Sequence, residues 1–363
     1  MSSETFLLHA LPAGNGDALV LEYGTDGQTS RILIDGGVSS AATAVGQFLG
    51  ANADLDLLVV THIDNDHIAG MVKLLKQADP PVPKQVWFNG FRHLPDTALE
   101  PMGPIEGEKL TALIVDRGYP WNTSFGQGPV AITEPAPATP PTPDPINGLQ
   151  FTVLSPGTEQ LRKLRKGTNW ADIVRAAGLD PHVPPPPQPP PVSGLERMGP
   201  PDVDVLADQS TDNDDTVANG STIALLAEFA QRTCLLAGDA HPDVIIAGID
   251  QLVGEGNVLD VDVFKLPHHG SKANVTRKLL SRVRAHTYVF STDGSGNQKH
   301  PNDQAVARVI KYGGRAPVLV FNYRSDRNSD WDSDVLRGKW GYQTVYPPEA
   351  KPGISVDLLA IER

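Results

Sequence analysis

The sequence has 363 residues, of which 40% are hydrophobic, a formal net charge of −13 and a single cysteine, Cys234. This length allows one large domain or two ordinary ones. The acidic balance argues against a protein held along nucleic acid by bulk positive charge. One cysteine excludes an intrachain disulfide framework and a cysteine-rich zinc site. The sequence has no run of about 18 apolar residues and no signal-peptide pattern, so we expect a cytoplasmic protein without a membrane partner.

Short apolar runs in the first 80 residues predict β-hairpins followed by a βαβ unit. Gly14 and Gly16 permit a sharp turn between the first two strands. The run 55–60 is almost continuously apolar, as expected for a strand covered on both faces. The expected strands are 6–11, 18–23, 31–34 and 55–60, and the expected helices are 43–49 and 68–76.

Residues 77–215 break this regular pattern with proline-rich runs at 135–146 and 183–201. Proline cannot donate a ladder hydrogen bond and favours extended conformations, so we predict loops at both runs. Between them we expect a strand at 148–154 and one or two helices over 158–177. We therefore predict one domain over 1–363 with 77–215 as an insertion, whose proline-rich loops could bind a protein partner.

Regular patterning returns after residue 215, and polar clusters follow the predicted strands at their ends. GDA at 238–240 follows one strand, and PHHG at 267–270 follows another. Loops at one edge of a packed sheet are where functional sites are usually built. The expected strands are 221–228, 232–237, 260–266, 286–291 and 317–322.

The most informative stretch is THIDNDHIAG at 61–70, directly after the apolar run 55–60. Its imidazoles and carboxylates suit zinc, manganese or iron. Burying so many such groups unpaired would be costly, which favours metal binding over a structural role. His62 and Asp64 could hold one cation while Asp66 and His67 hold a second. Two cations can stabilise both the attacking and the leaving oxygen of a displacement. A single cation can still lower the pKa of a bound water enough to supply hydroxide near neutral pH.

Such a site needs ligands from other strand ends. Asp239 could bridge two cations, and His268 could complete the group of Asp66 and His67. Between the adjacent histidines we favour His268 because it is nearer the strand end, and we expect His269 to support the loop or a substrate oxygen. Asp35 precedes two glycines, where an aspartate more often only caps the turn, so we assign it a supporting role.

In chain order, these motifs resemble the metallo-β-lactamase superfamily: strand-DGG, strand-THxxxDH, strand-GDA and strand-HHG. The superfamily pattern is H-x-H-x-D-H, and here Asp64 stands where the second histidine normally stands. That departure resembles the competence-related ComEC-type branch, whose pattern is H-x-D-x-D-H. GNGDALVLEYG at 14–24, NGSTIALL at 219–226, HHGS at 268–271 and KHPN at 299–302 resemble further elements of that branch. The resemblance covers about 1–75 and 215–325.

The resemblance implies an αβ/βα sandwich of two mixed sheets with outer helices and one or two divalent cations at one sheet edge. Zinc or manganese is expected first, and magnesium is a third option. Classical members carry another histidine before the GDA strand, and none occurs here between 184 and 233. Asn219 and Ser221 lie in that stretch as supporting residues. The group of His62 and Asp64 would then be completed by Asn219 or water, or the site would hold a single cation.

The resemblance also implies a hydrolase that cleaves phosphodiesters of DNA or nucleotides with metal-bound hydroxide. We expect Asp66 to orient the nucleophile while His300, Lys272 or the first-turn donors after Gly270 hold a substrate oxygen. Hydrolysis of a small-molecule ester, thioester, lactone or β-lactam is an alternative, disfavoured by Asp64 and the missing histidine. A non-catalytic binding module is a second alternative. It is disfavoured because the ligand set of the second cation (Asp66, His67, Asp239 and His268) is complete, and an inactive member would be expected to lose some of it.

Overall fold

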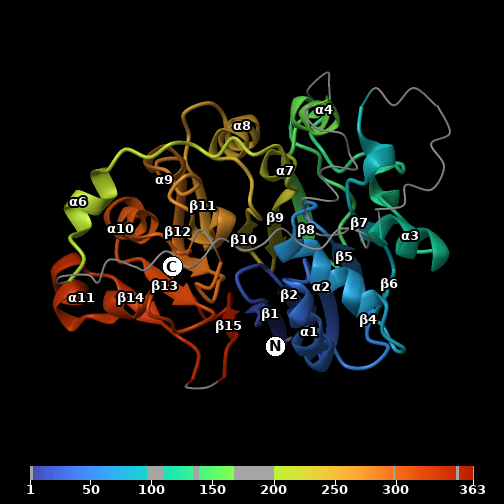
Figure 1. The fold of residues 1–363 in the computed structure, drawn as a ribbon, viewed down its shortest axis with the longest axis horizontal. Helices are drawn as coiled ribbons and strands as arrows, with labels where there is room; N and C mark the ends of the chain where they lie inside the picture. The colour runs from blue at the N-terminus through green and yellow to red at the C-terminus, as the bar shows by residue number, and fades with distance from the viewer. Residues whose placement is uncertain are drawn as a thin grey trace.

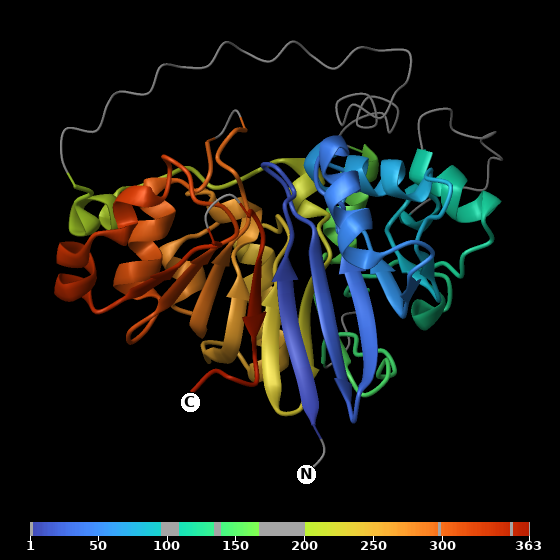
Figure 2. The same ribbon diagram turned by 90° about the horizontal axis from the view of Figure 1, so that it is seen from below.

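The computed structural model describes residues 3–95, 109–133, 139–166, 200–296, 299–348 and 351–362. Two large sheets pack face to face, and helices cover the outer face of each (Figures 1 and 2). In Figure 2 the strands stand side by side in the centre, with helices on both outer sides. This arrangement is the αβ/βα sandwich that the resemblance implies.

The first sheet has six strands in the order β15-β1-β2-β3-β5-β7. Its first strands form antiparallel hairpins, and β3, β5 and β7 then run parallel. The predicted hairpins and βαβ unit are therefore confirmed. The strands are β1 (Glu4–Ala10), β2 (Leu19–Thr25), β3 (Gln28–Ile34), β5 (Leu57–Val59), β7 (Val86–Trp87) and β15 (Ile354–Asp357). The helices on this side are α1 (Ala42–Leu49), α2 (Asn65–Leu75) and α3 (Lys109–Asp116).

The predicted strand 55–60 is divided in the structure. β4 (Asp54–Leu55) pairs with β6 (Val82–Pro83) in a small separate sheet, whereas β5 belongs to the large one. Asp56 lies at the break, where its carboxylate accepts from the Arg31 backbone N–H (3.1 Å) and from Lys84 Nζ (2.7 Å). These two hydrogen bonds hold the chain at the point where it passes from the small sheet to the large one.

The second sheet has seven strands in the order β14-β13-β12-β11-β10-β9-β8. β8, β9 and β10 are antiparallel, and the strands from β10 to β14 are parallel. The strands are β8 (Gln150–Ser155), β9 (Ala224–Phe229), β10 (Arg232–Leu236), β11 (Leu259–Lys265), β12 (Val283–Phe290), β13 (Val318–Phe321) and β14 (Gln343–Val345). The other helices are α4 (Thr158–Lys166), α6 (Val203–Asp208), α7 (Val217–Gly220), α8 (Pro242–Val253), α9 (Arg277–Leu280), α10 (Asp303–Tyr312) and α11 (Asp334–Trp340).

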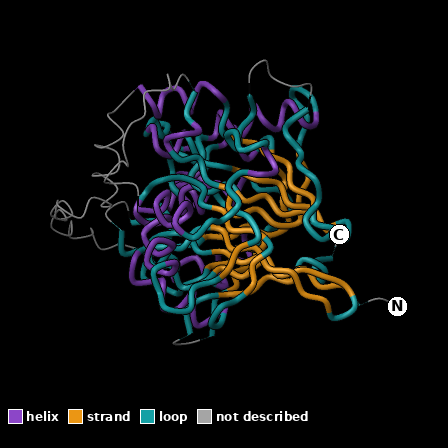
Figure 3. Tube along the Cα trace, turned by 90° about the vertical axis from the view of Figure 1, so that its right-hand side faces the viewer, coloured by secondary structure: helices purple, strands orange, loops and turns teal. Residues whose placement is uncertain are grey.

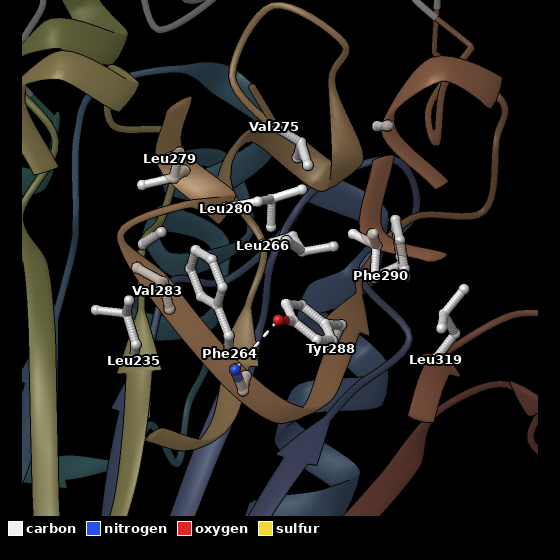
Figure 4. Packing of buried hydrophobic residues seen from close by; sticks show 14 of the residues in the cluster. Leu235, Phe264, Leu266, Val275, Leu279, Leu280, Val283, Tyr288, Phe290 and Leu319 are labelled. Carbon is white, nitrogen blue, oxygen red and sulfur yellow. Dashed lines mark hydrogen bonds between the residues drawn. The ribbon is translucent and has the colours of Figure 1, made fainter. Parts of the chain in front are cut away.

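Alternate side chains of each strand face the partner sheet, where they form the central core. The strands of the two sheets run together as one block with the helices around it (Figure 3). On the outer face of the second sheet, Phe264 and Tyr288 pack with Leu279 and other apolar side chains (Figure 4). The buried Tyr288 hydroxyl contacts the Ala285 backbone N–H at 3.1 Å, so the ring adds apolar area without leaving its oxygen unpaired.

Two strands of the sandwich, β7 and β8, come from the 77–215 range. The proline-rich run 183–201 and the predicted helical residues 167–177 fall almost wholly outside the described residues. The division of the chain into one domain with an insertion stays a prediction.

The parallel strands determine where polar residues gather. Asp35 follows β3, His62 lies shortly after β5, Asp239 follows β10 and His268 follows β11. Because the carboxyl ends of parallel strands meet at one edge of a sheet, chain segments far apart in sequence deliver these side chains to one place.

One buried histidine away from that edge gives a test of stability against pH. His93 is 5% exposed, neither ring nitrogen has a hydrogen-bond partner in the described chain, and its ring packs edge-on against Trp121. Burial and the nearby Arg92 charge lower the pKa of His93 to about 4, whereas an unfolded histidine titrates near ~6.5. Neutral His93 therefore stabilises the fold above the unfolded pKa, and this contribution declines as pH falls toward the folded pKa.

We expect the loss to be on the order of 3 kcal/mol when the pH is lowered through that window. The replacement His93→Phe keeps a ring against Trp121 but cannot titrate. Chemical denaturation of both proteins from pH 7 to pH 4 should show a shallower decline for the variant. Equal slopes would contradict the assignment.

Candidate metal centre

Asp239 lies at the centre of the site and is 2% exposed. Its Oδ1 is 3.3 Å from His67 Nε2. Its Oδ2 is 3.5 Å from His269 Nε2, 3.8 Å from His268 Nε2 and 3.9 Å from His62 Nε2. One carboxylate thus faces four imidazoles from two chain segments, 62–67 and 268–269.

A first group of potential ligands surrounds one side of Asp239. His62 Nε2 is 3.7 Å from Asp64 Oδ2, and His268 approaches Asp239 Oδ2 from the HHG loop. The buried His62 Nε2 has no hydrogen-bond partner in the described part of the chain. His268 therefore lies where it can supply the nitrogen that the missing histidine gives in classical members, a role the sequence left to Asn219 or water.

A second group is formed by His67, His269 and Asp66. His67 Nε2 and His269 Nε2 are 3.2 Å apart, and His269 Nε2 is 3.5 Å from Asp66 Oδ2. His269 thus occupies the place beside Asp66 and His67 that sequence reasoning gave to His268. The reason is local: both histidines have left-handed backbone conformations, which turn the second ring inward.

The separations fit metal ligands. Two atoms bound about 2.0–2.2 Å from one cation lie roughly 3.0–3.5 Å apart. The second group shows this spacing, and the first group is a few tenths of an ångström wider. Potential ligand atoms of Asp17, His67, Asp239 and His269, all buried, lie within 4.8 Å of one another.

Every imidazole facing Asp239 with Nε2 has a partner at Nδ1. His67 Nδ1 lies 2.8 Å from Asp35 Oδ2, and His269 Nδ1 lies 3.0 Å from the Ser291 carbonyl. His268 Nδ1 lies 3.0 Å from Asn274 Oδ1. Thr61 Oγ1 donates to Asp35 Oδ2 and so accepts from His62 Nδ1, at 3.0 Å. With each Nδ1 donating, the neutral form of each ring has its lone pair on Nε2, as is typical of metal-bound histidines.

Comparison with known proteins agrees with this geometry. Residues 11–148 match the family model described as the metallo-beta-lactamase superfamily. Over these residues the chain resembles a metallo-β-lactamase superfamily domain. Over 356 residues it is 22% identical to ComE operon protein 3 of Bacillus subtilis (strain 168), covering 92% of this chain and 34% of that protein. The chain thus spans about a third of that relative's length.

Two solved structures are also similar. One, assigned as a metal-dependent hydrolase from Parabacteroides distasonis, is 10% identical with a TM-score of 0.35 and covers 95% of this chain and 97% of that one. The other, CmlA, a diiron beta-hydroxylase from Streptomyces venezuelae, is 13% identical with a TM-score of 0.39, covering 98% and 55%. The superfamily domain and the buried Asp/His cluster together support a metal-dependent hydrolase. No helix in the described part of the chain has both the length and the apolar character needed to traverse a bilayer.

The imidazoles of this site differ in the direction in which their surroundings shift the pKa. Burial and the charge of His67 lower the pKa of His62 to about 4, so His62 is neutral at pH 7. Burial opposes the charged form of His67 and His269 too, but the attraction of Asp239 and other carboxylates raises the pKa of both well above the usual value. Burial and repulsion from Asp66 and Asp239 raise the pKa of Asp64 to about 7. Cation binding in place of these protons is therefore coupled to proton release.

A buried ion pair that sequence reasoning missed supports the second group. Lys265, fully buried at the end of β11, donates to Asp17 Oδ2 and to the Gly238 carbonyl (3.2 Å). Asp17 Oδ1 lies 3.3 Å from His269 Nδ1. The only sequence signal was the position of Asp17 in GNGDA, which predicted a turn.

The same turn packs directly on the second group. Asn15 Nδ2 donates to Asp66 Oδ2 at 2.9 Å, and a Cβ added to Gly16 would lie 1.7 Å from the Asp66 carbonyl oxygen. Glycine is thus needed at 16 for close approach to Asp66. Asp35 likewise does more than cap a turn, because it accepts from the Thr61 backbone N–H (2.8 Å) as well as facing His67.

The other site residues that the sequence predicted differ in how far they are buried. His300 is 7% exposed, and its ring centroid is 4.8 Å from that of His268. Lys272 is exposed on the loop after the HHG sequence. Asn219 Nδ2 lies 3.3 Å from His268 Nδ1, whereas the Ser221 hydroxyl donates to the Ala218 carbonyl and closes a turn. The catalytic and ligand roles of all these residues stay predictions.

Proposed function

We propose that this chain is a phosphodiesterase that cleaves DNA or nucleotides with two divalent cations, manganese or zinc. The observation that supports it most strongly is that two ligand groups share one carboxylate. The first group is His62, Asp64 and His268, the second is Asp66, His67 and His269, and Asp239 lies between them. The resemblance to the ComEC-type branch, including Asp64 in place of histidine, favours a phosphodiester over a lactone or β-lactam.

Cations bound there would lower the pKa of a water molecule and neutralise charge that develops on a phosphoryl group. The chain's own residues fix where this happens. Asp66 is held by Asn15 and directed toward His269, so it can orient a nucleophile while it binds a cation. Asp35 and Thr61 hold the imidazoles of His67 and His62 in place.

His300 is suited to contact the substrate. Both of its ring nitrogens lack a hydrogen-bond partner in the described chain, although the ring is almost fully buried beside His268. Burial and the charges of His268 and His269 lower its pKa to about 3, so it is neutral at pH 7 and offers one N–H. That N–H can donate to a nonbridging phosphate oxygen or to the leaving oxygen. Lys272, exposed nearby, can contact a phosphate further along a strand.

The test is cleavage of linear and circular DNA by metal-stripped protein resupplied with Mn²⁺, Zn²⁺ or Mg²⁺. We expect a divalent cation to restore cleavage in wild type and in Asp54→Ala, an exposed control on β4, but not in Asp66→Ala. Absence of cleavage by protein that retains its cations would overturn the phosphodiesterase proposal. Assays on esters, lactones and β-lactams would then identify the alternative.

A further inference from the structure

The segment between α6 and α7 is tied to the HHG loop by one buried side chain. Arg308, on α10, is 4% exposed, and its guanidinium donates to oxygens on both segments. On the 207–211 side the acceptors are the Ala207 carbonyl (3.4 Å), the Gln209 carbonyl (2.7 Å) and Thr211 Oγ1 (2.9 Å). On the loop they are the carbonyls of Lys272 (2.6 Å) and Val275 (3.0 Å). The segment therefore has a fixed position beside His268.

Asp214, on this segment, turns its carboxylate inward, and its side chain is only 4% exposed. Its Oδ2 accepts from Asn219 Nδ2 (2.7 Å) and Asn274 Nδ2 (3.0 Å) and lies 3.3 Å from His268 Nδ1. Its Oδ1 accepts from the backbone N–H (3.0 Å) and hydroxyl (2.7 Å) of Thr216. These bonds orient one oxygen of Asp214 toward the His268 ring.

We propose that Asp214 is a positioning residue that holds His268 in the first ligand group, an inference that rests on the proposed function. The His268 N–H at Nδ1 lies between Asp214 Oδ2 and Asn274 Oδ1, while Nε2 points toward Asp239. The left-handed backbone of His268 gives the ring no support from regular secondary structure. Asp214 fixes the tautomer and the direction of the His268 ring. His268, which follows β11, can therefore take the place of the histidine that is missing before β10.

The expected effect is on cation binding, because the carboxylate contacts the ligand and not the substrate. Loss of such a partner typically weakens metal affinity about 10–100-fold. We therefore expect Asp214→Ala to weaken one of two Mn²⁺ binding steps by this factor and to leave the other unchanged. Asp214→Asn keeps one acceptor oxygen and should show a smaller loss. The neighbouring exposed Asp215→Ala is the matched control and should bind as wild type does.

The measurement is Mn²⁺ binding by chelator competition, with cations per chain counted by native mass spectrometry. Selective weakening of one step supports the inference. Wild-type affinity in Asp214→Ala, or a single cation in wild type, overturns it. If the alanine variant does not fold, the asparagine variant decides: a weakened step supports the inference and an unchanged one overturns it. Two cations in wild type without DNA cleavage would overturn the proposed function alone.

Discussion

Replacing Asp239 by alanine is expected to abolish hydrolysis and to reduce cation binding at both ligand groups. Its Oδ1 lies beside His67 of the second group, and its Oδ2 lies beside His62 and His268 of the first group and His269 of the second. Without the carboxylate each group loses an anionic ligand, and the imidazoles lose the charge that draws them together. Losing several kcal/mol of charge stabilisation in the transition state corresponds to a fall of roughly 10³-fold or more in kcat/KM.

The measurement combines steady-state hydrolysis with metal analysis of the same preparation. Asp243→Ala is the control, because this exposed aspartate lies in the first turn of α8, close to Asp239 in sequence. Circular dichroism must show that the Asp239→Ala variant is folded. If it is not, the measurement uses Asp239→Asn, which keeps the shape of the side chain. A folded variant that retains two cations and wild-type activity would show that Asp239 is not a shared cation ligand.

Replacing His300 by alanine is expected to lower activity while both cations stay bound. The imidazole is buried beside His268, yet neither ring nitrogen is satisfied in the described chain, a costly state that suggests a partner arriving with the substrate. A positioned proton donor typically contributes 10²–10⁴-fold, so we expect kcat to fall by about that factor.

The control for this variant is His286→Ala, which removes an exposed histidine from β12. Removing this buried ring leaves a cavity, so thermal unfolding must first show that His300→Ala is folded at the assay temperature. Loss of a cation together with activity would show that His300 acts on the metal centre and not on the substrate. Unchanged activity would exclude it from catalysis.

The resemblance implied the sandwich, and local signals in the sequence predicted where the buried Asp/His cluster lies. Apolar runs ending in DGG, THIDNDH, GDA and HHG marked the strand ends, and parallel strands bring such ends to one edge. It also placed Asp66, His67 and Asp239 together, as the structure has them. β15 received no prediction, since its alternating, partly buried residues look like loop until β1 supplies a partner.

The details that sequence reasoning missed depend on contacts between distant residues. Two successive left-handed conformations place His269 beside Asp66, whereas adjacency along the chain had favoured His268 for that position. Asp214 and Lys265 become relevant only when folding puts them against imidazoles and Asp17. No local pattern distinguishes Asp214 from the acidic residues beside it.

The most direct test of the account is the number of cations bound to the wild-type chain. Native mass spectrometry of protein dialysed against Mn²⁺ or Zn²⁺, with elemental analysis of the same sample, gives this number without any assumption about substrate. We predict two cations per chain, falling to one or none in Asp239→Ala. A wild-type chain that binds no divalent cation at neutral pH, in folded protein, would contradict the central claim.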